Sequence, residues 1–265
     1  MFEATVVTVD TPRRRASAIQ FFAPVLEVLE STFRILEARV TPPQPTKWLD
    51  GFVFRYADQT IHQAVLQKLA RTISGLHAIE TLLAKGLHQE QGMIQRALDE
   101  IGEDIVFLSL AVIHGEVTPL HRQYLEYFYA EEFLDPSNLM ASHTSRGMVK
   151  REKIRAYNNR QHGNDASRAN IAGKVLTKAY SGFVHAASPH IMDMYVGKPY
   201  ARFDTTGELR HQFKAGEQAR DALNYFYRAM CSMALAAKAF DDDELFSAIK
   251  SKISELDTNM KTLRD

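Results

Sequence analysis

The sequence predicts an all-α protein: a bundle of about seven helices in one domain, preceded by a short N-terminal arm. Three observations predict this class. Apolar residues recur at spacings of three and four in most long segments, as expected for helices with one buried face. Proline or glycine interrupts this pattern where one helix should end and the next begin. The sequence lacks strand-like runs that would build a sheet, so we expect no sheet.

We expect residues 1–15 to form an extended arm, because three β-branched valines precede Pro12. The first helix should cover about residues 17–39 and end before the prolines at positions 42, 43 and 45. A second helical segment should cover about residues 47–85, with Gly86 as its C-cap.

The third helix should span about residues 90–114 and end at Gly115. Thr118 and Pro119 are typical of an N-cap followed by proline in the first turn. A fourth helix should therefore begin there and end at Asp135, which precedes another proline.

Residues 137–165 form a polar, basic connection, which we interpret as a loop and an exposed basic helix. A further helix is expected over about residues 165–187, followed by a short helix that begins at Ser188. Two last helices should lie near residues 208–240 and 242–263, with three aspartates between them that suit the N-terminus of the second.

The composition is that of a folded chain without net charge. Hydrophobic residues make up 45% of the 265 residues and charged residues 24%, close to the average of globular domains. The 32 basic and 32 acidic side chains cancel, so no overall field attracts nucleic acid or an anionic membrane. The single cysteine, Cys231, excludes an internal disulfide and fits a reducing compartment.

The N-terminus lacks the basic run and long apolar core of a signal peptide. The longest apolar-rich run, residues 105–113, is far shorter than the roughly 20 residues that a membrane-spanning helix needs. We therefore expect a cytoplasmic protein with no membrane partner.

The segment from Tyr180 to Tyr195 carries the strongest functional signal. It places His185 and His190 on either side of a predicted break between two helices, with Asp193 one turn further on. A histidine in the last turn of a helix favours its charged form, and one in the first turn favours its neutral form. The two histidines are therefore candidates for acid–base catalysis.

A structural interpretation of the same segment stays open. His185 and His190 would then cap helix ends, while Asp193 and Tyr195 close a local hydrogen-bond network. Polar side chains on an apolar background must be hydrogen-bonded, solvated or functional, because burying them unpaired is costly. The pattern alone does not decide whether any reaction is catalysed.

Arg96 and Glu100 form a second candidate site. They lie one turn apart on the third predicted helix, away from its apolar stripe, at a spacing that permits an ion pair. The helix becomes apolar all round after Ile105, so the pair should lie near the edge of a buried region. The alternative is a solvated ion pair of the helix surface.

Basic residues in the 137–165 connection are candidates for contact with a nucleic-acid backbone, with Tyr157 among them. RNA is the less favoured partner because the chain has no net charge, and a solvated connecting helix is the alternative. The candidate residues are Lys150, Arg151, Lys153, Arg155 and Arg160.

No metal and no cofactor are expected. A di-iron bundle needs Glu-x-x-His on two helices, and the sequence offers only the reversed order His77–Glu80. Glycine-rich phosphate loops are also missing. Cys231 lies among methionines and alanines, so we expect a buried core thiol.

Arg96–Glu100, the run from Tyr180 to His190, and Tyr195 with the following Val-Gly together resemble a group of bacterial all-helical proteins of unknown function. That group is distantly similar to the HEPN superfamily of helical bundles. The resemblance covers about residues 90–200. It implies a metal-independent ribonuclease with His185 as the general base, although position 180, where the family pattern has Arg, is Tyr.

Three functions follow as hypotheses. The leading one is a helical protein whose polar pocket binds a small anionic or nucleotide-like ligand through Arg96. In that pocket Glu100 would orient the arginine, Tyr180 and Tyr195 would belong to the lining, and the two histidines would donate hydrogen bonds. The second is HEPN-like RNA cleavage or RNA binding. The third is an interaction scaffold whose last helices, residues 208–263, carry a partner or homodimer surface.

Overall fold

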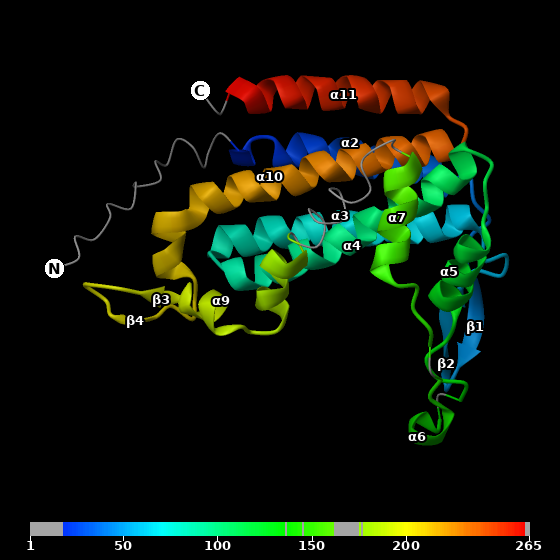
Figure 1. Ribbon diagram of the computed structural model, residues 1–265, viewed down its shortest axis with the longest axis horizontal. Helices are drawn as coiled ribbons and strands as arrows, with labels where there is room; N and C mark the ends of the chain where they lie inside the picture. The colour runs from blue at the N-terminus through cyan, green and yellow to red at the C-terminus, as the bar shows by residue number, and fades with distance from the viewer. Residues whose placement is uncertain (1–17, 136, 145, 162–174, 176, 263–265) are drawn as a thin grey trace.

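The computed structural model describes residues 18–135, 137–144, 146–161, 175 and 177–262. Over these residues the chain is a helical bundle, as predicted, with two small hairpins at its ends (Figure 1). The predicted arm, residues 1–15, lies outside the described residues. None of the described helices is both long and apolar enough to cross a membrane.

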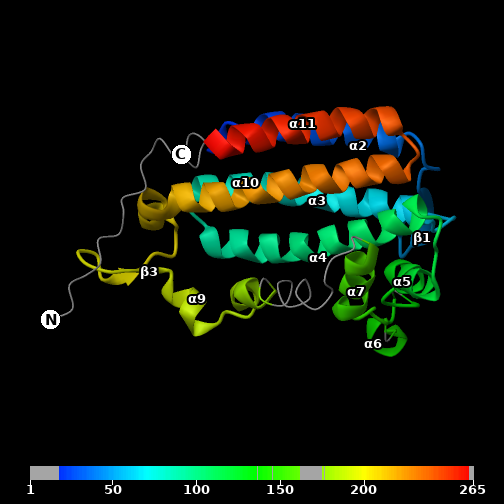
Figure 2. The same cartoon turned by 45° about the horizontal axis from the view of Figure 1, so that its top comes forward.

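Five long helices build the body of the molecule, and α10 lies at its centre. α10 contacts the other four. Figure 2 shows α2 and α11 on one side of α10 and α3, and α4 on the other. The five helices are α2 (Phe22–Glu37), α3 (Ile61–Lys85), α4 (His88–Ile113), α10 (Glu208–Ala239) and α11 (Asp243–Thr262).

One continuous hydrophobic core joins these helices. At its centre Phe22 of α2 stacks on Phe226 of α10, with ring centroids 4.2 Å apart. Both rings are fully buried, as are Leu76 of α3 and Leu108 of α4. Each such side chain contributes about 1.5–3 kcal/mol relative to exposure, so burial of this stripe is what holds the predicted amphipathic helices together.

The prediction that a helix covers residues 47–60, and that the chain has no sheet, is wrong. Strands β1 (Gln44–Trp48) and β2 (Gly51–Arg55) pair as an antiparallel hairpin, and α3 begins only at Ile61. Aromatic and β-branched residues dominate this stretch, and they favour strands. Thr60 then starts α3 with a capping box, in which its hydroxyl accepts from the Gln63 backbone at 3.2 Å.

Several predicted helix ends are confirmed. Gly86 ends α3 in a left-handed conformation, with φ of 71°. Thr118 and Pro119 begin α5 (Pro119–Tyr129), which ends before Phe133, earlier than predicted. Acidic residues open α11, where Asp243 and Glu244 lie in the first turn.

The polar connection is less exposed than predicted. It contains α6 (Leu139–Ser142) and α7 (Arg151–Gln161), and α7 packs on α4. The expectation of an exposed basic helix is wrong, because Ile154 and Tyr157 anchor α7 in the core and draw Arg155 below the surface. Part of the next predicted helix, residues 165–174 and 176, lies outside the described residues.

Two arms extend from the bundle, one near each end (Figure 1). The β1–β2 hairpin, α5 and α6 form one arm. The other contains α9 (Ser188–Met192), which begins at the predicted Ser188, and a hairpin of β3 (Tyr195–Val196) with β4 (Arg202–Phe203). The buried carboxylate of Asp204 joins this second arm to α10, because it accepts from the backbone N–H groups of Gly207 and Arg210 at 2.9 and 2.8 Å.

Candidate functional site

Arg96 and Glu100 form the ion pair that their spacing permits. Nη2 of Arg96 donates to Oε1 of Glu100 at 2.6 Å along α4. The side chain of Arg96 is 15% exposed and that of Glu100 is 40% exposed. The charge of Arg96 is therefore balanced within its own helix, and such i,i+4 pairs contribute only about 0.3–0.5 kcal/mol.

The two predicted histidines have different surroundings. Nε2 of His190 donates to the backbone carbonyl of Ala179 at 2.8 Å, and the Phe183 ring packs edge-on against the imidazole with centroids 4.5 Å apart. His185 lies in the turn before α9 and is exposed. Among the described residues, no hydrogen bond or ion pair joins either histidine to Arg96 or Glu100.

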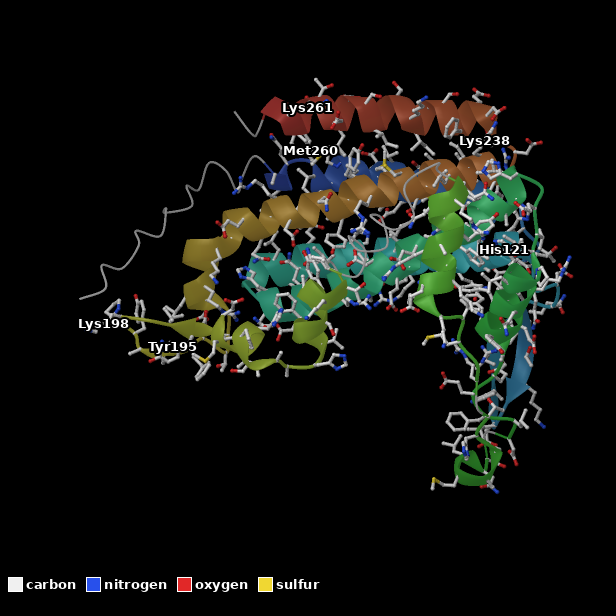
Figure 3. All side chains as sticks on the ribbon, viewed as in Figure 1. His121, Tyr195, Lys198, Lys238, Met260 and Lys261 are labelled. Atoms are coloured by element: carbon white, nitrogen blue, oxygen red, sulfur yellow. The ribbon has the colours of Figure 1, made fainter. Side chains whose placement is uncertain are left out.

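The side chains of Asp193 and Tyr195 contact residues other than the His190 imidazole. Asp193 lies 3.5 Å from Nζ of Lys214. Tyr195 packs edge-on against Phe203 across the β3–β4 hairpin, with centroids 5.3 Å apart. Figure 3 shows Tyr195 on the second arm, at the end of the molecule away from His121. This arrangement agrees better with the structural interpretation of the segment than with an acid–base pair.

Tyr180 is the predicted residue that enters a buried polar network. Its hydroxyl donates to Oδ2 of Asp221 on α10 at 2.8 Å, and Nε2 of Gln95 on α4 donates to the same oxygen at 3.0 Å. The Tyr180 ring also meets Tyr225 edge-on at 6.2 Å between centroids. Tyr180 thus fixes its own segment to the α4–α10 interface.

An ion pair continues this network by one turn. Nη1 of Arg228 on α10 donates to Oδ1 of Asp99 on α4 at 2.6 Å, and the guanidinium lies 5.0 Å above the Tyr225 ring. Asp99 is buried, whereas the Arg228 side chain is 40% exposed. We call Gln95, Asp99, Asp221, Tyr225 and Arg228, together with Tyr180, the α4–α10 network.

Burial shifts the acid–base behaviour of this network. Desolvation raises the pKa of Asp221, the nearby charge of Asp99 raises it further, and hydrogen bonds from Tyr180 and Gln95 only partly offset this. Desolvation also raises the pKa of Tyr225, as does the charge of Asp99. Burial of Arg228 disfavours its charged form and acts to lower its pKa. The Asp99 carboxylate outweighs this effect and keeps the pKa of Arg228 above its ordinary value.

A cavity of about 250 Å³ adjoins the α4–α10 network. We call it the Arg228 cavity. Its walls come from α3, α4, α7 and α10, and Arg228 and Tyr225 belong to both cavity and network. The apolar part of the lining is Leu98, Val106, Ala229 and Leu235. The remaining residues are Thr72, Gly102, Glu103, Asn158, Cys231 and Ser232.

Ion pairs join α7 to α4 beside the cavity, at its lining residue Glu103. Nε of Arg155 donates to Oε1 of Glu103 at 2.6 Å, and Arg151 pairs with both Glu103 and Asp104. These two arginines of the predicted nucleic-acid face therefore turn inward. The other three, Lys150, Lys153 and Arg160, are exposed.

The sequence reasoning missed Asp99, Asp221 and Arg228. A signal was available, because Gln91, Gln95 and Asp99 repeat every four residues on one buried face of α4, where apolar residues are expected. Cys231 was predicted to be a buried core thiol, but it is only partly buried and lines the cavity. Burial nevertheless raises its pKa, which disfavours a reactive thiolate.

Among the described residues, no group of three or more histidine, cysteine or acidic side chains is placed to hold a metal ion. Comparison with protein-family models, with curated proteins and with solved structures gave no match. The function must therefore be inferred from the geometry of the site.

Proposed function

We propose that this protein binds a small amphipathic anion in the Arg228 cavity. The observation that carries the proposal is a guanidinium in the cavity wall whose side chain is 40% exposed although its partner, Asp99, is buried. A guanidinium has five N–H donors in a planar fork. Only Nη1 of Arg228 donates to Asp99, so a carboxylate or phosphate in the cavity can accept hydrogen bonds from the other N–H groups of the guanidinium.

The rest of the cavity favours a ligand with an apolar body. Leu98 and Val106 of α4 and Ala229 and Leu235 of α10 line the space, and the guanidinium lies over the Tyr225 ring. Thr72 and Ser232 add hydroxyl groups that can bind a polar substituent. This combination of an apolar lining and a few converging polar groups is typical of small-molecule sites.

The size of the cavity narrows the ligand class. About 250 Å³ is slightly below the usual range of about 300–1,000 Å³ for ligand pockets. A carboxylic acid or phosphate ester with a short chain or one ring fits this space better than a dinucleotide. In this proposal Arg228 provides the anion contact that the sequence analysis assigned to Arg96. Tyr180 lies outside the cavity lining and contributes to the α4–α10 network through its hydrogen bond to Asp221.

The ribonuclease alternative has less support. The Tyr180 hydroxyl, at the position where the family pattern has Arg, donates to Asp221. His185 is exposed, and among the described residues no hydrogen bond or ion pair joins its side chain to an arginine. Metal-independent cleavage of RNA that is lost in His185→Ala would reverse this preference.

A thermal-unfolding titration tests the proposal. The probes are benzoate, phenylacetate, hexanoate and phenyl phosphate, with inorganic phosphate and AMP for comparison. A ligand that binds only the folded state at 100 times its Kd stabilises by about 2.7 kcal/mol. We expect at least one probe with an apolar body to raise the melting temperature of the wild type.

Arg228→Gln should abolish this rise, measured relative to the variant's own ligand-free melting temperature. Arg96→Gln is the matched control, because it removes an arginine of α4 that does not line the cavity, and it should keep the rise. No stabilisation by any probe, or a rise that survives in Arg228→Gln and is lost in Arg96→Gln, would reject this assignment.

A further inference from the structure

A second site lies on the arm that carries the β1–β2 hairpin. A groove of about 680 Å³ opens between this hairpin, the end of α5 and the loop that follows α5. It shares no lining residue with the Arg228 cavity. Six aromatic rings line it, and they are those of Trp48, Phe54, Tyr56, Phe128, Tyr129 and Phe133.

The groove is held in shape by contacts of its own residues. The Arg55 guanidinium lies 5.9 Å from the centre of the Trp48 ring, and its Nη2 donates to Oε2 of Glu131 at 3.0 Å. The Tyr129 hydroxyl donates to the backbone carbonyl of Thr60 at 2.9 Å. Thr144 fixes the loop, because its hydroxyl donates to the Glu131 carbonyl at 2.7 Å. These contacts position Trp48, Tyr129 and the loop before any partner binds.

The charges around the groove disfavour a polyanion. Arg55 pairs with Glu131, and Arg146 lies 3.4 Å from Glu132, so two cations are matched by two carboxylates. Binding of a nucleic-acid backbone needs cations that neutralise its phosphates. The Glu132 side chain is 67% exposed. The pair that Glu132 forms with Arg146 is exposed and therefore weak, so the Glu132 carboxylate can pair with a cation of the ligand instead.

The groups that line the groove fit a peptide backbone that lacks internal hydrogen bonds. The indole N–H of Trp48 is a donor, and the Tyr56 hydroxyl and the amide groups of Gln59 and Gln67 can also donate. A polyproline II segment presents unpaired carbonyl oxygens and flat proline rings, and it loses little entropy on binding because it is already extended. Aromatic-lined grooves are a recurring way to recognise such segments.

Exposed apolar residues extend this surface beyond the groove. Leu49 is 52% exposed and Leu134 is 80% exposed, and both lie on the same arm as the groove. Clusters of exposed large apolar side chains are uncommon on soluble domains unless they contact a partner.

We propose that the aromatic groove binds an extended, proline-rich peptide with a basic residue at one end. The prolines stack on the rings of Trp48, Phe54 and Tyr56, the donors of the groove bind the peptide carbonyls, and the basic residue pairs with Glu132. This site is independent of anion binding in the Arg228 cavity.

Trp48 makes the test specific, because it is the only tryptophan of the chain and lines the groove. The full-length protein is titrated with a ten-residue peptide of prolines and two terminal arginines, and the emission of Trp48 is followed. A peptide with the same arginines but glycine and serine in place of proline is the first comparison. Oligouridylate of ten nucleotides is the second.

The proline-rich peptide should give a saturable change in Trp48 emission, and the glycine–serine peptide should bind at least tenfold more weakly. Phe54→Ala should weaken binding about tenfold, as expected when an aromatic anchor is lost. Phe54 is 59% exposed, so the variant should fold. Phe52→Ala is the matched control: its ring packs edge-on against Phe54 at 5.4 Å but does not line the groove, and it should change affinity less than twofold.

Glu132→Gln should weaken binding of the peptide with arginines and leave a peptide with norleucine in their place unaffected. No change in Trp48 emission with the proline-rich peptide would overturn the proposal. Equal loss of binding in Phe52→Ala and Phe54→Ala would also overturn it. Saturable binding of oligouridylate that is lost in Phe54→Ala would assign the groove to nucleic acid instead.

Discussion

Asp99 of α4 and Arg228 of α10 are joined by a hydrogen bond of 2.6 Å at the wall of the Arg228 cavity. This contact has two consequences. It fixes the two central helices in register, and it holds a guanidinium at the point where an anionic ligand would enter. Asp99 is buried and Arg228 is partly exposed, so removal of the arginine leaves a carboxylate without its cation.

Arg228→Leu should therefore lower the free energy of unfolding. Breaking a buried ion pair costs about 3–5 kcal/mol, and because Arg228 is 40% exposed we expect about half of this, roughly 1–3 kcal/mol. Urea unfolding measures the loss. The double variant Asp99→Leu/Arg228→Leu should recover most of it, because both charges are then absent. A double variant less stable than Arg228→Leu would contradict this account of the pair.

Asp221 should make the folded state less stable as pH rises. Its pKa is raised in the folded protein, mainly by burial and next by the charge of Asp99, so the folded state binds its proton more tightly than the unfolded state does. The stabilising effect is complete below the unfolded pKa of about 3.9 and is lost as pH rises through the higher folded pKa.

Asp221→Asn should remove this pH dependence and raise stability at pH 7 relative to the wild type. The amide oxygen can still accept from Tyr180. Glu255→Gln is the control, because Glu255 is largely exposed and should leave the profile unchanged. The measurement is urea unfolding at several values between pH 4 and pH 8. If the variant kept the wild-type pH profile, ionisation of Asp221 would not lower the free energy of unfolding, which would contradict this account.

His121 should make the folded state less stable at acid pH. It is fully buried against Phe107, with ring centroids 3.9 Å apart, and its Nδ1 accepts from the Thr118 backbone at 3.1 Å. Burial is the main cause that lowers its pKa. The neutral ring is therefore favoured in the folded state, so stability is full above the unfolded pKa of about 6.5 and falls as pH drops through the lower folded value.

Replacement of His121 with Gln should flatten the stability profile below pH 6.5, measured by thermal unfolding between pH 5 and pH 7.5. His77→Gln is the control, since that side chain is 50% exposed and pairs with Glu30 at the surface. An equal effect of both variants would mean that the buried imidazole does not control stability at acid pH.

Gly207 should tolerate no larger residue. It adopts φ of 83° at the start of α10, and an added Cβ would lie 2.4 Å from the backbone oxygen of Lys85. Both the left-handed backbone and the clash with main-chain atoms oppose a side chain. Gly207→Ala should cost about 2 kcal/mol or more in urea unfolding. Gly197→Ala, where the described surroundings leave open space, should cost less than half as much.

The helical periodicity was sufficient to predict the bundle, because α2, α3, α4 and α10 bury continuous apolar stripes. The β1–β2 hairpin was missed because its aromatic residues are exposed on a small sheet, so no alternation marks it. The pairing of Asp99 with Arg228 joins residues 129 positions apart. Such a contact follows from how the helices cross, and the pattern within either helix does not reveal it.

The spacing of Arg96 and Glu100 did predict their ion pair, because i and i+4 are neighbours on any helix. The hypothesis of one pocket also required this pair to lie beside His185 and His190. Whether residues so far apart in the sequence meet depends on how the helices pack, which the spacing within one helix does not reveal. Tyr180 and His190 lie in the same segment, yet one donates to α10 and the other to a backbone carbonyl of its own segment.

Gly102 offers the most direct test of anion binding in the Arg228 cavity. It lines the cavity, and a Cβ at this position meets no described atom within 4 Å. Gly102→Ala adds one methyl group and favours the helix, whereas Gly102→Leu fills the space. Isothermal titration calorimetry with the best-binding small carboxylate should give wild-type affinity in Gly102→Ala and no measurable binding in Gly102→Leu. Undiminished binding in a correctly folded Gly102→Leu variant would contradict the assignment of the ligand to this cavity.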